Sequence, residues 1–541
     1  AMANLVRATT VMGAGTIASR ALGFIKAIVL AQALGVVASA GADSFAVANQ
    51  MPNNLYVIVA GGVLSATLVP AIVRSAIHAD GGAAYINKLI TIALAVLTAA
   101  GLVATLLAPV LVRLYATHWS ENQLALATAF AYWCLPQIFF YGLYTLLGEI
   151  LNARSIFGPS TWAPVANNVV AISGLIAFIA LFGADSAGVR SVTDWTPGMI
   201  TLVAGTATAG IAAQALILLV FWKRLNIRFR LDFAWRGVGL RETGKIAGWT
   251  FGMIVVTQIA GLVETNVSAL SSGNGASVFA FQTAWLAFML PHSIIAVSLA
   301  TAYFTRMATH ATGGDMNALR ADTAAALRRI LTLILWASAG LVAIAIPFAR
   351  LFTSSFSGSL TLAGIIMVLV VGLPAFSALF VILRVFFALG DGRTPFFVTL
   401  FQAVVVIILV LCCAALPREY IVLGVGVSLS IAGTAQTLLA ASLLRRKLAT
   451  GVDRSVVGAV LRGIVGAVVA SLVGLYATYA LGGLTASGFP LSGFVPAILS
   501  MVLVGLVVTV AFVGVLAALR SPELGEGWAI IRRARSRKSA E

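Results

Sequence analysis

The residues of this sequence that could do chemistry are ionisable side chains inside long apolar runs. Arg20 and Lys26 lie in the first run, Glu264 in the middle of the chain and Arg384 in its second half. A charge inside a bilayer is costly, so such residues usually face a cavity, a partner or an ion. Arginine and lysine could hold a phosphate group, whereas a carboxylate could bind a cation or exchange a proton.

The two cations of the first run are six residues apart. At 3.6 residues per turn, Arg20 and Lys26 point roughly 240° apart around a helix axis. A wide cavity, or a break near Gly23, is therefore needed to expose both to one ligand. The alternative for Lys26 is that its long side chain simply reaches the membrane surface.

Two acids have comparable alternatives. Asp43 follows the glycine-containing segment 35–42 and opens the second apolar run, so it could cap a helix or pair with Arg20 or Lys26 in a gate. Glu264 is the most central acid, and we expect it to protonate, to pair or to bind a cation. A structural hydrogen bond would also account for Glu264.

The elements that must position these residues are membrane-spanning helices. The chain has 541 residues, of which 60% are hydrophobic and 9% charged, whereas soluble domains carry about 25% charged residues. Cys134, Cys412, Cys413 and the four histidines do not have the spacing of a metal site. The acids expected in outer loops are scattered, so we expect no enzyme and no metal.

About fourteen apolar runs are long enough to cross a bilayer, which needs about 20 residues each. The fold class is therefore an all-α integral membrane protein. The expected spans are 5–34, 43–77, 85–115, 122–151, 160–183, 197–222, 243–270, 276–308, 324–349, 359–389, 394–416, 420–445, 456–482 and 490–519.

The basic residues orient these spans. With the N-terminus in the cytoplasm, Arg20, Lys26 and Arg384 lie inside spans, and nearly all the other lysines and arginines fall on the cytoplasmic side. The exceptions on the outer side are Arg113, Arg190, Arg350 and Arg418. This asymmetry follows the positive-inside rule and places both termini in the cytoplasm. The net charge of +17 then indicates contact with anionic lipids and not with nucleic acid.

An internal repeat of six helices is visible in two places. Phe45-Ala46 and Ala66-Thr67 have the spacing of Phe279-Ala280 and Ala300-Thr301, and Leu135-Pro136 resembles Leu373-Pro374. Chance matching of apolar sequence is the alternative. A parallel repeat predicts two lobes with a substrate site between them. The expected parts are an N-lobe at 1–222, a basic connector at 223–242, a C-lobe at 243–447, two extra helices at 448–520 and a basic tail at 521–541.

Several short blocks together resemble the MurJ (MviN) family of lipid II flippases, which belongs to the multidrug/oligosaccharidyl-lipid/polysaccharide exporter superfamily. The first block is SRALGFIK at Ser19–Lys26. The others include Asp43-Ser44-Phe45, Pro52-Asn53, Gly62-Val63-Leu64-Ser65, Val69-Pro70, Gly148, Leu151-Asn152, Phe157, Ala163-Pro164, Asn168, Arg384, Phe386-Phe387-Ala388, Asp391 and Thr394-Pro395. Their order and spacing cover roughly the whole chain.

The resemblance implies two six-helix lobes around a cationic cavity, with the last two helices forming a groove for a polyprenyl tail. It implies that Arg20 is a cavity and gate residue, that Lys26 binds pyrophosphate and that Asp43 is the acidic gate partner. Some relatives bind a cation between helices seven and eleven, which here would involve Glu264 and Gln402.

The sequence also departs from the better-known pattern of that family, in the direction of its actinobacterial branch. Tyr56, Gly61, Leu286 and Met289 stand where arginines and acids are often found. We therefore expect Arg20, Lys26 and Arg384 to hold the pyrophosphate. Neighbouring polar residues would assist them, namely Asn49, Gln50, Asn53 and the gate acid Asp43.

The predicted function is that of a flippase for lipid II or a similar polyprenyl-pyrophosphate glycolipid, working by alternating access as a monomer in the bacterial cytoplasmic membrane. No cofactor is expected, although sodium, protons or the membrane potential could supply the coupling. The alternatives are a flippase for another polyprenyl-linked saccharide and a drug/cation antiporter of the same superfamily.

Overall fold

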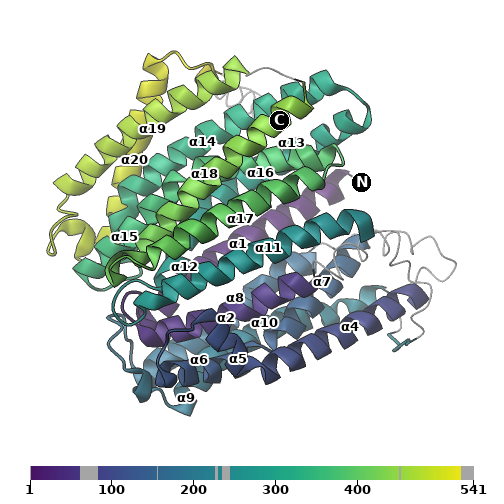
Figure 1. The fold of residues 1–541 in the computed structure, drawn as a ribbon, viewed down its shortest axis with the longest axis vertical. Helices are drawn as coiled ribbons and strands as arrows, with labels where there is room; N and C mark the ends of the chain where they lie inside the picture. The colour runs from purple at the N-terminus through teal and green to yellow at the C-terminus, as the bar shows by residue number, and fades with distance from the viewer. Residues whose placement is uncertain are drawn as a thin grey trace. The chain divides into compact units, whose positions relative to one another are not determined.

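A computed structural model describes residues 2–60, 83–154, 156, 158–225, 229–233, 244–449 and 453–525. Almost all of these residues are helical, and the described part contains no β-strand beyond one isolated bridge between Val37 and Ala276. The chain forms two compact units, Ala1–Phe279 and Ala280–Glu541. Figure 1 shows the helices as ribbons, coloured along the chain.

The expected all-α membrane fold is confirmed. Within the described residues, 12 helices are long and apolar enough to cross a membrane, and the bent pair Phe356–Val371 and Leu373–Ala388 raises the count to 13. The predicted number of about 14 also includes the second span, 43–77, of which residues 61–77 lie outside the described part. The count of 14 therefore stays a prediction.

In the described part of the first unit there are nine longer helices. They are α1 (Met2–Leu34), α2 (Ala40–Val59), α4 (Ala83–Leu106), α5 (Ala108–Tyr115), α6 (Glu121–Cys134), α7 (Gln137–Ala153), α8 (Gly158–Phe182), α10 (Thr206–Val220) and α11 (Gly244–Ser268). The π-helical turn η3 (Thr201–Gly205) joins the short α9 (Pro197–Ile200) to α10. Helix α8 packs between α1 and α10, and α2 packs on α6.

The loops at one end of the first unit fold onto one another. The backbone N–H of Ala38, after α1, donates to Gly275 O at 2.9 Å, and that of Asp185 donates to Gln32 O at 3.2 Å. Both oxygens of Asp185 accept backbone N–H groups, from Val189 and Arg190 at 2.9 Å each. This satisfied network fixes the ends of α1, α8 and α11 together at what the charge pattern predicts to be the outer side.

The second unit contains the remaining helices. They are α12 (Val278–Pro291), the π-helical turn η6 (His292–Ala296), α13 (Val297–Thr312), α14 (Met316–Arg350), α15 (Phe356–Val371), α16 (Leu373–Ala388), α17 (Arg393–Cys413), α18 (Ile421–Lys447), α19 (Arg454–Ala480) and α20 (Phe494–Ala518). Helices α19 and α20 run beside α14 (Figure 1). The last two helices therefore pack on a helix of the expected C-lobe.

The two Leu-Pro pairs occupy equivalent places in the two units. Helix α6 ends at Cys134, directly before Leu135-Pro136, and α7 begins at Gln137. Helices α15 and α16 meet at a bend of 40° beside Leu373-Pro374. Proline lacks the N–H that would continue the helix, which explains both breaks. The shared position supports the predicted internal repeat.

The predicted division at 222 differs from the boundary between the compact units, because α11 packs against α2 and α5. Of the predicted connector 223–242, residues 223–225 and 229–233 are described. The first three belong to the short 3-10 helix η4 (Trp222–Leu225), and 229–233 run extended along α4. The backbone N–H groups of Arg230 and Asp232 donate to Asn87 Oδ1 (3.3 Å) and Thr91 Oγ1 (2.9 Å). Two residues of extended chain span about one helical turn, so the spacing fits. The predicted tail lies outside the described residues after Gly525.

Candidate functional site

The first unit encloses a cavity of about 100 Å³ between α1, α2, α7, α8 and α10. Its polar wall consists of Lys26, Asn49, Tyr141, Asn167 and Thr206, and the rest of the lining is apolar. None of the described residues that line it is acidic. The structure thus brings together Lys26 and Asn49, which the sequence predicted as substrate-binding residues.

Lys26 is partly buried and forms no hydrogen bond or ion pair with any described residue. An ammonium group removed from water and left without a counter-charge is unfavourable. Because the cavity offers only neutral groups, an anion that enters it would gain the full attraction of Lys26 at a low local dielectric.

Asn49 is oriented by a buried amide. Gln137 is 0% exposed, and its Nε2 donates to Asn49 Oδ1 at 3.2 Å and to Thr208 Oγ1 at 2.9 Å. Thr208 in turn donates to Trp133 O at 2.7 Å. Since the oxygen of Asn49 is engaged, its Nδ2 group remains available as a donor.

Three further polar wall residues, Tyr141, Asn167 and Thr206, were not predicted from the sequence. The hydroxyl of Tyr141 has no hydrogen-bond partner among the described residues, and its ring stacks on Tyr56 with centroids 5.8 Å apart. Asn167 Nδ2 donates to Gln214 Oε1 at 2.9 Å, which fixes the amide. Helix α10 approaches so closely that a Cβ on Gly210 would lie 2.5 Å from Asn167 Oδ1. For Tyr141, the sequence signal that could have been used is its place among the polar residues of α7, directly after the break at Leu135-Pro136.

The other predicted residues of the first two helices lie elsewhere. Arg20 and Asn53 are exposed and do not line the cavity. The neighbour of Arg20, Ser19, accepts a hydrogen bond at its backbone oxygen from Asn168 Nδ2 at 2.9 Å. This contact holds α1 against α8 and explains why the Asn168 block accompanies the Ser19–Lys26 block in the sequence.

Asp43 is 1% exposed in the first turn of α2. Its Oδ2 accepts from the hydroxyl of Ser272 at 2.6 Å and its Oδ1 from the backbone N–H of Phe279 at 3.0 Å. Phe279 lies in the first turn of α12, where N–H groups lack helical partners. Both donors belong to the first unit, so Asp43 ties α2 to the segment Ser272–Phe279, and both of its oxygens are occupied by neutral donors. Its predicted pairing with a cation stays a prediction.

Glu264 lies in α11 and is partly buried, with no hydrogen bond or ion pair to the described residues. The residues around it fasten α11 to the rest of the first unit. Gln50 Nε2 donates to Thr265 Oγ1 at 3.0 Å, and Asn266 Nδ2 donates to Leu114 O at 2.7 Å. Glu264 is thus a carboxylate held on a well-fixed segment and still open to a cation or a proton.

In the second unit, Arg384 lies on α16 between two aromatic rings. Its guanidinium carbon is 4.6 Å from the ring centre of Phe380 and 5.1 Å from that of Phe304. The Nε atom is buried without a hydrogen-bond partner in the described part. Stacking on ring faces holds the cation while its donors stay available for an anion. Gln402 lies partly buried on α17 and forms no hydrogen bond with described residues.

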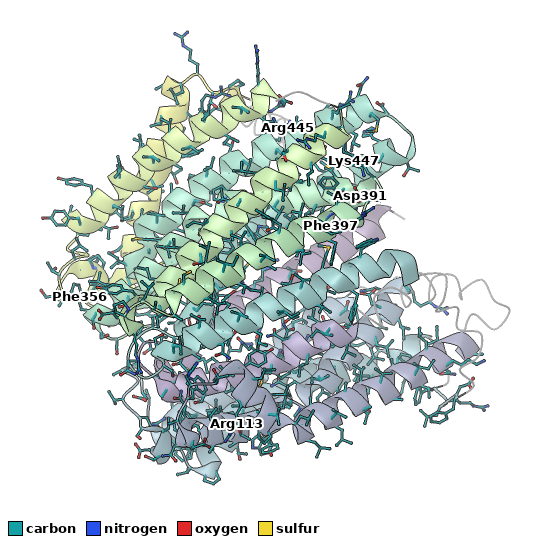
Figure 2. All side chains as sticks on the ribbon, in the orientation of Figure 1. Arg113, Phe356, Asp391, Phe397, Arg445 and Lys447 are labelled. Atoms are coloured by element: carbon teal, nitrogen blue, oxygen red, sulfur yellow. The ribbon has the colours of Figure 1, made fainter. Side chains whose placement is uncertain are left out.

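Polar contacts close one end of the second unit. Asp391 accepts from the backbone N–H of Thr394 at 2.9 Å, from the Thr394 hydroxyl at 2.7 Å and from Lys447 at the end of α18. Figure 2 shows Asp391, Lys447 and Arg445 at the end of this unit opposite Phe356. Among the described residues, no three His, Cys, Asp or Glu side chains are grouped closely enough to hold a metal ion.

Comparison with known proteins identifies the family. The sequence profile described as "Lipid II flippase MurJ" matches residues 30–518. The chain belongs to the MurJ family. It is 25% identical over 403 residues to a probable lipid II flippase MurJ of Rhizobium meliloti (strain 1021), covering 72% of each chain. It is 23% identical over 414 residues to that of Rickettsia prowazekii (strain Madrid E), covering 74% of this chain and 77% of the relative.

Solved structures confirm the fold. An inward closed conformation of lipid II flippase MurJ superposes with a TM-score of 0.70 at 21% identity, covering 93% of this chain and 98% of that structure. An inward-facing MATE family transporter of the MOP superfamily superposes with a TM-score of 0.65 at 17% identity, covering 80% and 94%. Because both MurJ and MATE proteins share this fold, the side chains of the cavities must decide what is carried.

One position at which this sequence departs from the better-known MurJ pattern lies beside the Lys26 cavity. Tyr56 stands where the resemblance places an arginine, and its hydroxyl donates to Thr145 Oγ1 at 2.7 Å. Through its stacking on Tyr141 it supports the cavity wall. In this MurJ member the position therefore contributes a rigid wall to the Lys26 cavity, where an arginine would contribute a second charge.

Proposed function

We propose that this chain carries lipid II, or a closely similar polyprenyl-diphosphate glycolipid, from the inner to the outer leaflet of the bacterial cytoplasmic membrane. The observation that supports this most is the cavity around Lys26. It offers an ammonium group, the Asn49 Nδ2 and the Tyr141 hydroxyl, each without a described partner, and no carboxylate. Such a set of donors favours an anion such as a phosphoryl group.

The size of the cavity defines which part of the lipid it takes. A volume of about 100 Å³ has room for a few water molecules. A phosphoryl group fits such a space, and the saccharide and the polyprenyl tail do not. We therefore assign Lys26, Asn49 and Tyr141 to the diphosphate, while the sugar stays in a wider space and the tail in the lipid.

Arg384 is a second anion contact in this proposal. Its guanidinium is held by Phe380 and Phe304 and has no described hydrogen-bond partner. With one cation site in each unit, alternating access would pass the diphosphate from one to the other as the units move. Arg20, on the exposed face of α1, and Asn53 would meet the lipid before Lys26 does, and Asp43 would hold the outer gate.

Coupling is the third part of the proposal. Glu264 has no described partner, and Gln402 is the polar residue of α17 that the family resemblance associates with it. We propose that they bind a sodium ion or that Glu264 exchanges a proton, with the membrane potential as a further driving force. The chain would act as a monomer with both termini in the cytoplasm, in contact with anionic lipids and without a catalytic step.

Depletion and complementation test the proposal. A strain in which the native gene is switched off should be rescued by the wild-type chain, and lipid II on the inner leaflet should stay low. The variant Tyr141→Phe, which removes one donor and keeps the ring, should slow flipping, and inner-leaflet lipid II should rise. Rescue by the chain without any change in lipid II, but with altered efflux of a cationic drug, would favour the antiporter alternative.

A further inference from the structure

A second cavity lies on the outside of the first unit, at the ends of α8 and α10. It measures about 300 Å³ and is lined by Gly158, Pro159, Trp162, Ala163, Ile217 and Phe221. The side chains of these residues are apolar, and the indole N–H of Trp162 is their only polar group. The cavity shares no lining residue with the Lys26 cavity.

The residues that line this cavity are held in place by close packing. Trp162 is fixed by α1, because a Cβ on Gly15 would lie 2.8 Å from its Nε1. The missing side chain of Gly158 opens the space, since a Cβ there would meet nothing within 4 Å. Ala163 forms the floor at 1% exposure and belongs to the hydrophobic core of the unit.

The cavity continues into a lipid-facing stripe. Trp162, Val169 and Ile176 are exposed to 42%, 48% and 56% and recur every seven residues, which places them on one side of α8. On α10, Leu216 and Val220 are exposed as well. An apolar stripe of this kind on a spanning helix faces acyl chains, so the cavity opens towards the bilayer.

The charge at the mouth is positive. Lys223 is exposed and lies two residues beyond Phe221, and it begins the basic connector. Trp162 and Trp222 flank the same end, and tryptophan is enriched where a membrane meets water. Lys223 would lie at the depth of the lipid headgroups, where the cytoplasmic leaflet carries anionic lipids.

We propose that this cavity binds one acyl chain of an anionic phospholipid of the cytoplasmic leaflet, with Lys223 contacting the phosphate of its headgroup. The proposal rests on the proposed orientation of the chain but not on its substrate. A resident lipid here would brace the ends of α8 and α10, two helices that also line the Lys26 cavity.

Native mass spectrometry of the full-length purified protein tests the proposal. With added phosphatidylglycerol, the wild-type chain should retain a bound lipid. Gly158→Leu fills the cavity and should lower that retention at least about fivefold, given the loss of several buried methylenes. Lys223→Gln should lower retention of phosphatidylglycerol more than that of phosphatidylethanolamine, whose own ammonium group offsets the charge of its phosphate. Gly514→Leu, at a glycine of α20 with open space around it, and Lys88→Gln are the matched controls.

The outcomes separate this site from the transport site. Lys26→Met should lose flipping and keep the phospholipid. If Gly158→Leu fails to fold, Ile217→Trp fills the same cavity from α10. Unchanged phosphatidylglycerol retention in whichever of these filled variants folds would overturn the proposal. So would equal losses of both lipids in Lys223→Gln, or displacement of the lipid by a polyprenyl diphosphate, which would assign the cavity to the substrate tail.

Discussion

Lys26 is the residue on which the proposed anion site depends most. Lys26 lines the cavity of about 100 Å³, and no acid is present in the described wall. Lys26→Met keeps the length of the side chain and removes its charge. A hydrogen bond to a charged group contributes about 1.5–3 kcal/mol, so we expect flipping to fall about tenfold to hundredfold. The measurement is the rate at which lipid II becomes accessible on the outer leaflet of proteoliposomes.

Lys26→Arg is the matched control, because it keeps the positive charge and adds bulk. It should retain more flipping than Lys26→Met. If both variants flip at the wild-type rate while inserting normally, Lys26 has no part in substrate binding. Loss of protein from the membrane in both would instead point to a role in packing α1 against α8.

Glu264 offers a second test at the scale of one side chain. Glu264→Gln imitates a protonated carboxyl and removes the charge that a sodium ion needs. With proton coupling, the variant should lose transport and its dependence on pH. With sodium coupling, it should need more sodium to reach the same rate. Transport rates that do not change with sodium or pH, and that equal the wild-type rates, would leave Glu264 a structural residue.

At the scale of elements, Asp391 links the loop between α16 and α17 to the end of α18. Burial by itself raises the pKa of Asp391, but hydrogen bonds from Lys447 and Thr394 and the charge of Lys447 lower it below its ordinary value. A lowered folded-state pKa means that the contact stabilises the fold above the unfolded pKa of about 4 and is lost as the pH falls below it.

We therefore expect Asp391→Asn to destabilise the second unit at neutral pH by about 1 kcal/mol, a value reduced by the partial exposure of Lys447. The difference between variant and wild type should disappear as the pH falls through the folded-state pKa, because wild-type Asp391 then becomes neutral too. Thermal unfolding measured in a series of buffers from neutral pH down to about pH 2 tests this. A difference that grows towards low pH would contradict the assigned contact.

The packing of α19 on α14 depends on a row of small residues. A Cβ on Gly474 would lie 2.5 Å from Ala343 Cβ and from Val508 Cγ2. Small residues let membrane helices approach closely, and overpacking costs about 1–3 kcal/mol. Gly474→Leu should lower the unfolding temperature, whereas Gly514→Leu, in open space on α20, should not. Equal unfolding temperatures for the two variants would show that α19 is not held by this contact.

At the scale of the whole molecule, the charge pattern predicts which loops face outwards. Cysteines at Asn274 and Ser487, both exposed, should react with an impermeant thiol reagent added to intact cells, and a cysteine at Lys223 should not. Ser272 is a poorer probe position, because it donates to Asp43 and accepts from Gln123. Reaction at Lys223, with protection of the other two positions, would reverse the predicted topology.

The sequence alone determined the class of the fold. The length of an apolar run decides whether it can span a bilayer, and the asymmetry of loop charge decides its orientation, and both depend only on local sequence. Leu135-Pro136 and Leu373-Pro374 could likewise be recognised as breaks, since proline acts on its own helix. Arg20, Lys26 and Glu264 could be selected as candidate site residues from the sequence, because an ionisable residue within an apolar run is costly wherever its neighbours lie.

Only the tertiary structure decided which of these residues meet. Lys26 and Asn49 share a cavity, whereas Arg20, on the same helix as Lys26, lies on an exposed face. Tyr141 joins that cavity from α7, almost a hundred residues along the chain, and Gln137 of the same helix orients Asn49. Asp43 accepts hydrogen bonds from the hydroxyl of Ser272 and from the backbone N–H of Phe279, both more than 200 residues further along the chain. Such contacts depend on how helices distant in sequence pack, and side-chain type and spacing do not encode that packing locally.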